Sequence, residues 1–184
     1  SNSVDVKHEK HSNRMALLHG AIVTAIIDNK MDEHGPIIAE VMVAWAEAGV
    51  MLTTLTDEEI SQLKKQGKAE TCYGGGKAKG DSPCLSHRPQ EVQIYGGTYI
   101  QQAYLMRDQF TKKQFKIIDK YIDTLYKKYI EPWTLSAGKS SVGFFQMADG
   151  TISVLSYLAW KDKPEEAAKW IKRGIKKANK VVYL

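Results

Sequence analysis

The sequence has few cysteines, which could form disulfides, and few prolines, which break helices and strands. Its 184 residues include 2 cysteines and 5 prolines, and no internal repeat is present. The longest apolar stretch, residues 36–55, contains Glu40 and Glu47, which argues against a membrane-spanning helix. Hydrophobic residues make up 43% and charged residues 26%, so the composition is globular rather than disordered. A chain of this length buries enough surface to need no disulfide or metal, and we expect a single globular domain over residues 1–184.

Motifs of several enzyme classes are missing or incomplete. There is no Glu-x-x-His pair, which di-metal carboxylate bundles require. A phosphate-binding loop ending in Gly138-Lys139 would need a glycine five residues earlier, where the chain has Trp133. The Ser-x-x-Lys pattern at Ser136 lacks the companion motifs of the β-lactamase class. The sequence predicts neither a metal site nor a cofactor.

Helical periodicity dominates the chain. In the first predicted helix, residues 8–29, Met15, Leu18, Ile22 and Ile26 share one face. Pro36 suits the first turn of a second helix, apolar nearly all round and therefore expected at the centre of the core. Further helices are predicted over residues 56–66, 98–109, 111–131 and from 164 onward. The predicted fold is mainly α, with five to six helices around the apolar helix 36–55.

The strongest helical pattern follows Thr111. Thr111 and Gln114 form a capping box at its start, and Pro132 is expected to end the run. Its apolar positions step by three and four residues: Phe115, Ile118, Ile122, Leu125 and Tyr129. Such a stripe is either core or a helix–helix seam. A homodimer through residues 115–129 is therefore one interpretation, and self-association is expected.

One small β-hairpin is predicted near the dipeptide Asp149-Gly150, which suits a type I′ turn. This turn would pair Met147 with Ile152 and Phe145 with Val154 on a common face. A helix–turn–helix over the same span is the alternative, because short apolar runs do not distinguish strand from helix.

A loop over residues 67–92 contains both cysteines and many glycines. A disulfide between Cys72 and Cys84 would fit an exported protein, because cytosolic thiols stay reduced. The alternative pairs Cys84 as a nucleophile with His87 as a base. Residues 1–7 are expected to be a disordered or expression-derived start, which fits either a cleaved secretory signal or a trimmed tail. Localisation therefore leans towards a periplasmic or secreted protein.

One segment resembles a known enzyme family. Glu131 is followed by Ser140-Ser141-Val142-Gly143-Phe144-Phe145-Gln146-Met147, which is similar to the signature of lysozyme-like transglycosylases. The resemblance implies that Glu131 is a general acid that protonates a glycosidic oxygen, and that the segment 140–147 lines a sugar-binding groove. Glycan cleavage is thus the enzymatic alternative.

Positive charge is expected mainly at the C-terminus. The net charge is +5, and residues 164–184 hold six Lys or Arg against two Glu. Their basic face would include Lys172, Arg173 and Lys176, while Ile171, Ile175, Ala178 and Val182 are expected to face inward. This basic helix would bind an anionic polymer or lipid, although its charge order equally suits a solvated surface helix. The near-neutral remainder argues against a nucleic-acid partner.

The sequence as a whole favours a non-enzymatic binding or interaction protein of unknown ligand. Tyrosine covers contact area at low entropic cost, so tyrosines are candidate contact residues. The cysteine loop contributes a lysine to the same predicted contact surface. The candidate contact residues are Tyr73, Lys77, Tyr99, Tyr104, Tyr126 and Trp133. A protein or small-molecule partner is expected, with glycan cleavage and anionic-polymer binding as alternatives.

Overall fold

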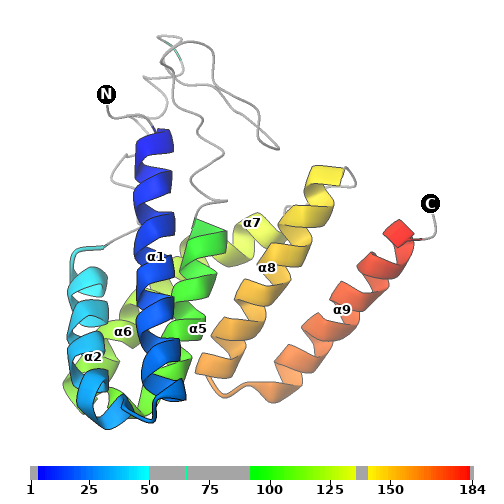
Figure 1. Ribbon diagram of the computed structural model, residues 1–184. Coiled ribbons are helices and arrows are strands. Elements are labelled where there is room, and N and C mark those ends of the chain that lie inside the picture. The colour runs from blue at the N-terminus through cyan, green and yellow to red at the C-terminus, as the bar shows by residue number, and fades with distance from the viewer. Residues whose placement is uncertain (1–3, 50–64, 66–91, 136–140, 183–184) are drawn as a thin grey trace.

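The computed structural model describes residues 4–49, 65, 92–135 and 141–182, and every element within these residues is helical (Figure 1). The predicted mainly helical fold is confirmed for this part of the chain. The elements, in chain order, are α1 (Val4–Ile27), α2 (Met31–Glu47), the π-helical turn η1 (Val92–Gly96), α5 (Gly97–Leu105), the 3₁₀ turn η2 (Arg107–Gln109), α6 (Lys112–Leu125), the π-helical turn η3 (Tyr126–Ile130), α7 (Glu131–Leu135), α8 (Ser141–Trp160) and α9 (Pro164–Val182).

The core lies between α1, α2, α5, α6 and α8, with α5 packed most extensively against α8. The only extensive contact of α9 within the described residues is with α8, and Figure 1 shows α9 at the edge of the bundle. Helix α1 packs with Met15, Leu18 and Ile22 buried, as predicted, but Ala25 takes the next core position and Ile26 is exposed. Only the last buried position of α1 differs from the prediction, by one residue.

The prediction of a central helix at residues 36–55 is wrong for the described part of that segment. The helix there is α2, which begins at Met31, contains Pro36 and packs at one side of the bundle against α1 and α6 (Figure 1). Only one face of α2 is buried, and Ile37 is 63% exposed. The apolar composition of α2 therefore did not lead to complete burial, because α1 and α6 cover only one side of this helix.

Helix α6 forms as the capping box predicts. The Thr111 hydroxyl accepts from the Gln114 N–H at 3.2 Å, and the Gln114 side chain accepts from the Thr111 N–H at 2.9 Å. The predicted stripe is in the core of the monomer, where Ile118, Ile122 and Leu125 are completely buried. The interpretation of this stripe as a homodimer seam is therefore wrong, because the chain's own helices already cover it.

Pro132 does not end the helical path. After α6 the backbone widens into η3 and continues as α7, with Pro132 as the second residue of α7. A proline cannot donate a backbone hydrogen bond, and its ring collides with the carbonyl four residues before it. A π-helical turn just ahead of the proline relieves this conflict, so the chain stays helical through Pro132.

The predicted β-hairpin is wrong, because Asp149 and Gly150 lie within the continuous helix α8. Gly150 is buried, and a Cβ there would collide with the Thr134 hydroxyl and the Gln93 amide. The Gln93 side chain donates to Thr134 Oγ1 at 2.9 Å, and the Ser153 hydroxyl donates to the Gln93 carbonyl at 2.6 Å. The glycine is thus required for close helix packing rather than for a turn.

The predicted start of the last helix at Pro164 is confirmed. Asp162, with φ 55°, reverses the chain, and the Lys163 N–H donates to the Leu158 carbonyl at 2.9 Å, a Schellman-type ending for α8. The expected inward orientation of Ile171 and Ile175 is wrong, since both are exposed. The side chains of Ala178 and Val182 lie outside the described residues.

Several predictions also fall on residues that the structure does not describe. These are the helix at residues 56–66, most of the loop 67–92, and the side chains of Cys72, Tyr73, Lys77, Cys84 and His87. Among the helices that the structure does describe, none has the length and hydropathy needed to cross a bilayer.

Candidate functional site

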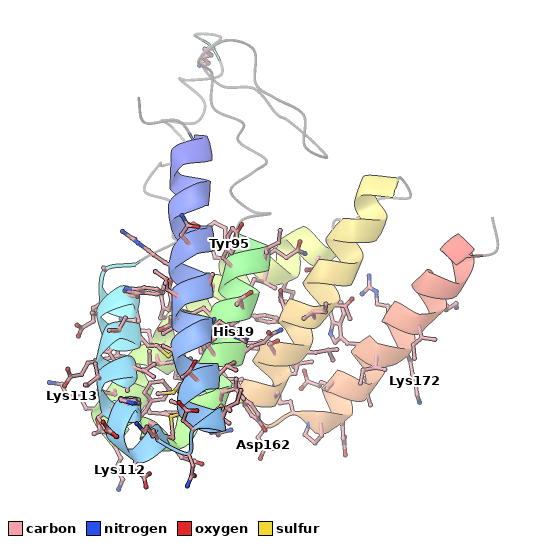
Figure 2. The ribbon with its side chains drawn as sticks, in the orientation of Figure 1. His19, Tyr95, Lys112, Lys113, Asp162 and Lys172 are labelled. Carbon is pink, nitrogen blue, oxygen red and sulfur yellow. The ribbon has the colours of Figure 1, made fainter. Side chains whose placement is uncertain are left out.

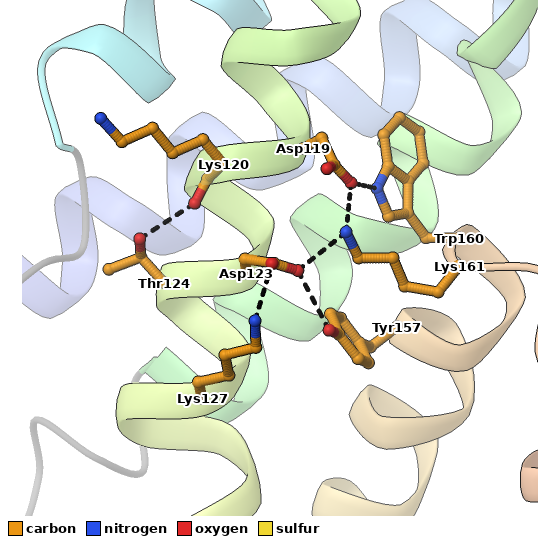
Figure 3. A network of polar contacts seen from close by, with 8 residues as sticks. All are labelled: Asp119, Lys120, Asp123, Thr124, Lys127, Tyr157, Trp160 and Lys161. Atoms are coloured by element: carbon orange, nitrogen blue, oxygen red, sulfur yellow. Dashed lines mark hydrogen bonds and ion pairs between the residues drawn. The ribbon is translucent and has the colours of Figure 1, made fainter.

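The outer face of α6 and η3 is densely charged. Residues 112–130 contain six lysines and two aspartates. Asp119 and Asp123 lie one turn apart on α6, on the edge of the helix that faces the end of α8 (Figure 3). The way these two carboxylates are bound determines what charge the face presents to solvent.

Asp119 is bound by two consecutive residues at the end of α8. Its Oδ1 accepts from Trp160 Nε1 at 2.8 Å and from Lys161 Nζ at 2.5 Å (Figure 3). Trp160 is almost completely buried and stacks on Phe115 of α6, with ring centroids 4.8 Å apart. Because the indole is held by the core, its N–H is a fixed donor for Asp119.

Asp123 has three donors. Its Oδ1 accepts from the Tyr157 hydroxyl at 3.0 Å and lies 2.9 Å from Lys161 Nζ, while its Oδ2 accepts from Lys127 Nζ at 2.9 Å. Burial alone raises the pKa of Asp123, but the hydrogen bonds from Lys127, Lys161 and Tyr157 outweigh it and lower the pKa to about 2. Asp123 is therefore ionised and fully engaged at neutral pH.

The same interactions affect their donors. Burial raises the pKa of Tyr157, and its hydrogen bond to Asp123 raises it further. Burial lowers the pKa of Lys161, but hydrogen bonds to Asp119 and Asp123 reverse this and leave it raised. Tyr157 and Lys161 keep their protons at neutral pH, so their hydrogen bonds anchor α6 to the end of α8.

Three lysines of α6 and η3 are left for solvent. Lys116, Lys120 and Lys128 are exposed, and none has a carboxylate within ion-pair distance among the described residues. Lys128 lies over the Tyr129 ring, 5.4 Å from its centroid. These side chains, with Asp119, Asp123, Thr124 and Lys127, line a shallow open depression of about 470 Å³. We call Lys116, Lys120 and Lys128 the α6 lysine row.

Two further lysines lie in the first turn of α6. Lys112 and Lys113 are exposed at the end of the bundle where α6 begins (Figure 2), and the first turn has no acidic residue. The N-terminus of a helix carries partial positive charge, so cations there are unfavourable. Helix stability therefore does not account for these two lysines, and they extend the positive face beyond the α6 lysine row.

Glu131, the residue implied by the lysozyme-like resemblance, is the first residue of α7 and is partly buried. Its Oε1 accepts from the Tyr126 hydroxyl at 2.9 Å, and the Tyr126 ring stacks on Tyr157 with centroids 3.6 Å apart. Burial, followed by the hydrogen bond to Glu131, raises the pKa of Tyr126. Residues 141–147 belong to α8, but their side chains lie outside the description, so the implied sugar groove stays a prediction.

The predicted contact residues do not form one surface within the described part of the chain. Tyr99 is completely buried in α5, and its hydroxyl donates to the Met42 carbonyl at 2.7 Å. Tyr126 is also buried, so neither ring is available to a partner. Tyr104 is exposed on α5, and the side chain of Trp133 lies outside the description. Of the predicted contact residues whose side chains are described, Tyr99 and Tyr126 belong to the core and only Tyr104 is exposed.

The predicted basic face of α9 is exposed at Lys172, Arg173 and Lys176. The guanidinium of Arg173 lies 5.0 Å from the centroid of the Trp170 ring, beside α8. The expectation that positive charge lies mainly at the C-terminus is wrong, because residues 112–130 carry the same excess of cations as α9. A count of charges along the sequence would have revealed the α6 lysine row, but not which carboxylates are neutralised.

Comparisons with known proteins give no independent indication of function. The chain matches no protein-family model, no curated protein and no solved structure. Within the described residues, no three His, Cys, Asp or Glu side chains are grouped so that they could hold a metal ion. The function is therefore inferred from the geometry of the α6 face.

Proposed function

We propose that the protein is a binding protein for a linear anionic polymer, such as an acidic polysaccharide, and that the α6 lysine row is its contact surface. The observation that carries the proposal is the asymmetry of α6. Both aspartates are held by Tyr157, Trp160 and Lys161 at the end of α8. The exposed lysines of the row have no carboxylate at ion-pair distance among the described residues. The surface therefore presents positive charge that its own carboxylates do not neutralise.

The shape of the site favours an extended ligand. Neighbouring lysines of the row are separated by roughly one or two helical turns of ~5.4 Å, and the depression between them is shallow and open. Each ammonium contributes a point charge without a fixed bidentate geometry. Affinity then comes from several weak contacts and from counterion release, and both increase with the number of anionic groups on one chain.

Electrostatics within the helices distinguishes α6 from α9 as the site. In α9, Glu165 and Glu166 occupy the first turn, and the cations follow, so its charge order stabilises the helix. In α6, lysines occupy the first turn, where they oppose the dipole. The charge order of α9 agrees with its dipole, whereas the first-turn lysines of α6 oppose theirs, so α6 is the stronger candidate for the polymer-binding surface.

The test compares two variants that lose the same number of charges. Heparin is the probe, and binding is measured by fluorescence anisotropy at several salt concentrations. We expect Lys116→Ala/Lys120→Ala/Lys128→Ala to weaken binding at least tenfold and to reduce the slope of log affinity against log salt by about two. The control, Lys169→Ala/Lys172→Ala/Lys176→Ala on α9, should lose less than threefold.

Two further arms test the details of the site. Lys127→Ala should lose less affinity than Lys120→Ala, because Lys127 is already paired with Asp123. A heparin dodecasaccharide should bind more tightly than a disaccharide. Equal losses in both triple variants would show non-specific charge attraction, and a loss confined to the α9 variant would place the site on α9. Either result overturns the proposal.

A further inference from the structure

Three exposed isoleucines lie on the hairpin formed by α8 and α9. Ile152 of α8 is 54% exposed, and Ile171 and Ile175 of α9 are 47% and 56% exposed. The residues of α9 that lie next to the bundle are instead Ala167, Trp170 and Gly174, which are partly buried. Packing therefore covers one edge of the apolar stripe of α9 and leaves Ile171 and Ile175 exposed.

Helix geometry places the three isoleucines together. A Cβ at Gly174 would lie 3.4 Å from Thr151 Cγ2, so Gly174 and Thr151 mark where the two helices touch. With 3.6 residues per turn, Ile171 and Ile175 lie on the flank of α9 next to this contact line. Both helices are right-handed and they run in opposite directions, so Ile152 of α8 lies on the same flank of the hairpin as Ile171 and Ile175. Tyr157 and Trp160, which contact α6, lie on the other side of α8.

Cations border this apolar flank. Lys172 and Lys176 follow the isoleucines around α9 and are exposed, with no carboxylate at ion-pair distance in the described part of the chain. Figure 2 shows Lys172 on the side of α9 that faces away from α8. The flank therefore combines three aliphatic side chains with a positively charged margin.

We infer that this flank, defined by Ile152, Ile171 and Ile175 with Lys172 and Lys176, docks on an anionic lipid bilayer surface. Helices that lie on membranes insert apolar side chains at the headgroup boundary while lysines meet the phosphates. The isoleucines come from two adjacent antiparallel helices, so they form a broad face suited to a planar surface. A second copy of this chain is a poor occupant, because Lys172 and Lys176 would approach their own counterparts.

The inference is independent of polymer binding, because it uses different residues. Its test is co-sedimentation with phosphatidylcholine vesicles that contain about 30% phosphatidylserine, an anionic lipid that attracts basic segments. We expect the unmodified protein to bind these vesicles and to bind pure phosphatidylcholine vesicles much more weakly. Ile152→Ser/Ile171→Ser/Ile175→Ser should reduce the partition coefficient at least fivefold, and Lys172→Ala/Lys176→Ala about tenfold.

The matched control changes an exposed aliphatic pair on α2. Ile37 and Val41 are exposed one turn apart, but Glu33 and Glu40 lie beside them. Ile37→Ser/Val41→Ser should leave vesicle binding within twofold, and thermal unfolding should show that all variants fold.

Four results would overturn the inference. The first is no binding of the unmodified protein to anionic vesicles, and the second is full binding by the isoleucine variant. The third is an equal loss of binding in the α2 control. The fourth is a loss in the α6 variant Lys116→Ala/Lys120→Ala/Lys128→Ala with no loss in the isoleucine variant or in Lys172→Ala/Lys176→Ala. The last result would show that α6 holds the lipid headgroups.

Discussion

Two segments of this protein have the same charge content and opposite environments. Residues 112–130, which form α6 and η3, and residues 164–182, which form α9, each hold six cations and two carboxylates. The first segment packs against α2, α7 and α8 as well as η1, while α9 packs mainly against α8 (Figure 1). Similar amphipathic sequences have thus become a core helix and a half-covered edge helix.

The difference lies in what the carboxylates bind. Asp119 and Asp123 of α6 are engaged by residues at and just after the end of α8, 34 to 42 positions away in the sequence. In α9, Glu166 pairs with nearby Lys163 at 3.0 Å, both side chains about half exposed. Long-range pairing fixes α6 in the bundle and leaves its lysines outward, whereas local pairing contributes little to how α9 is placed.

Truncation of one isoleucine in each segment should give the largest contrast. Ile122 is completely buried in α6, whereas Ile175 of α9 is 56% exposed. Ile122→Ala should lower the free energy of unfolding by about 2–5 kcal/mol through lost burial and a new cavity. Ile175→Ala should change it by less than about 0.5 kcal/mol. Urea denaturation measures both, and equal losses would show that α9 is packed in solution as tightly as α6.

Glycine substitutions in α8 and α9 sharpen the same contrast. A Cβ at Gly150 would collide with Thr134 and Gln93, so Gly150→Ala should destabilise the protein by about 1–3 kcal/mol. A Cβ at Gly174 would meet Thr151 at 3.4 Å, which is ordinary contact, and alanine is the better helix former. Gly174→Ala should therefore stabilise the protein by up to about 1 kcal/mol. Thermal unfolding reports both changes, and destabilisation of similar size would mean that α8 and α9 are as closely packed as α8 and the core.

Acid should weaken the α6 anchor. The pKa of Asp123 is lowered to about 2, so its stabilising contribution is fully present above the ordinary aspartate value near 3.9 and disappears as pH falls towards 2. Partial exposure limits this contribution to about 1–2 kcal/mol. Asp123→Asn should be less stable at pH 6 and should lose less stability than the unmodified protein between pH 4 and pH 2. Parallel pH curves for the two proteins would contradict this role.

The sequence predicted features that depend on near neighbours. The Thr111–Gln114 capping box, the buried stripe through Ile118 and Ile122, and the start of the last helix at Pro164 all follow from residues within two turns of one another. These predictions are confirmed because the interactions that cause them are local.

The features that the sequence did not predict depend on distant contacts. Gly150 looked like a turn residue, but its role comes from Thr134 and Gln93. Likewise, nothing near Asp119 indicates that Trp160 and Lys161 will bind it. The surplus of lysines in residues 112–130 was visible in the sequence, yet only the fold shows which charges remain for a ligand.

The most direct test of the account uses the unmodified protein. Lysine acetylation by an amine-reactive ester, followed by mass spectrometry with and without heparin, reports which ammonium groups the polymer covers. The account predicts slower acetylation at Lys116, Lys120 and Lys128, with Lys169, Lys172 and Lys176 nearly unchanged. Protection of the α9 lysines with no protection of the α6 lysine row would contradict it.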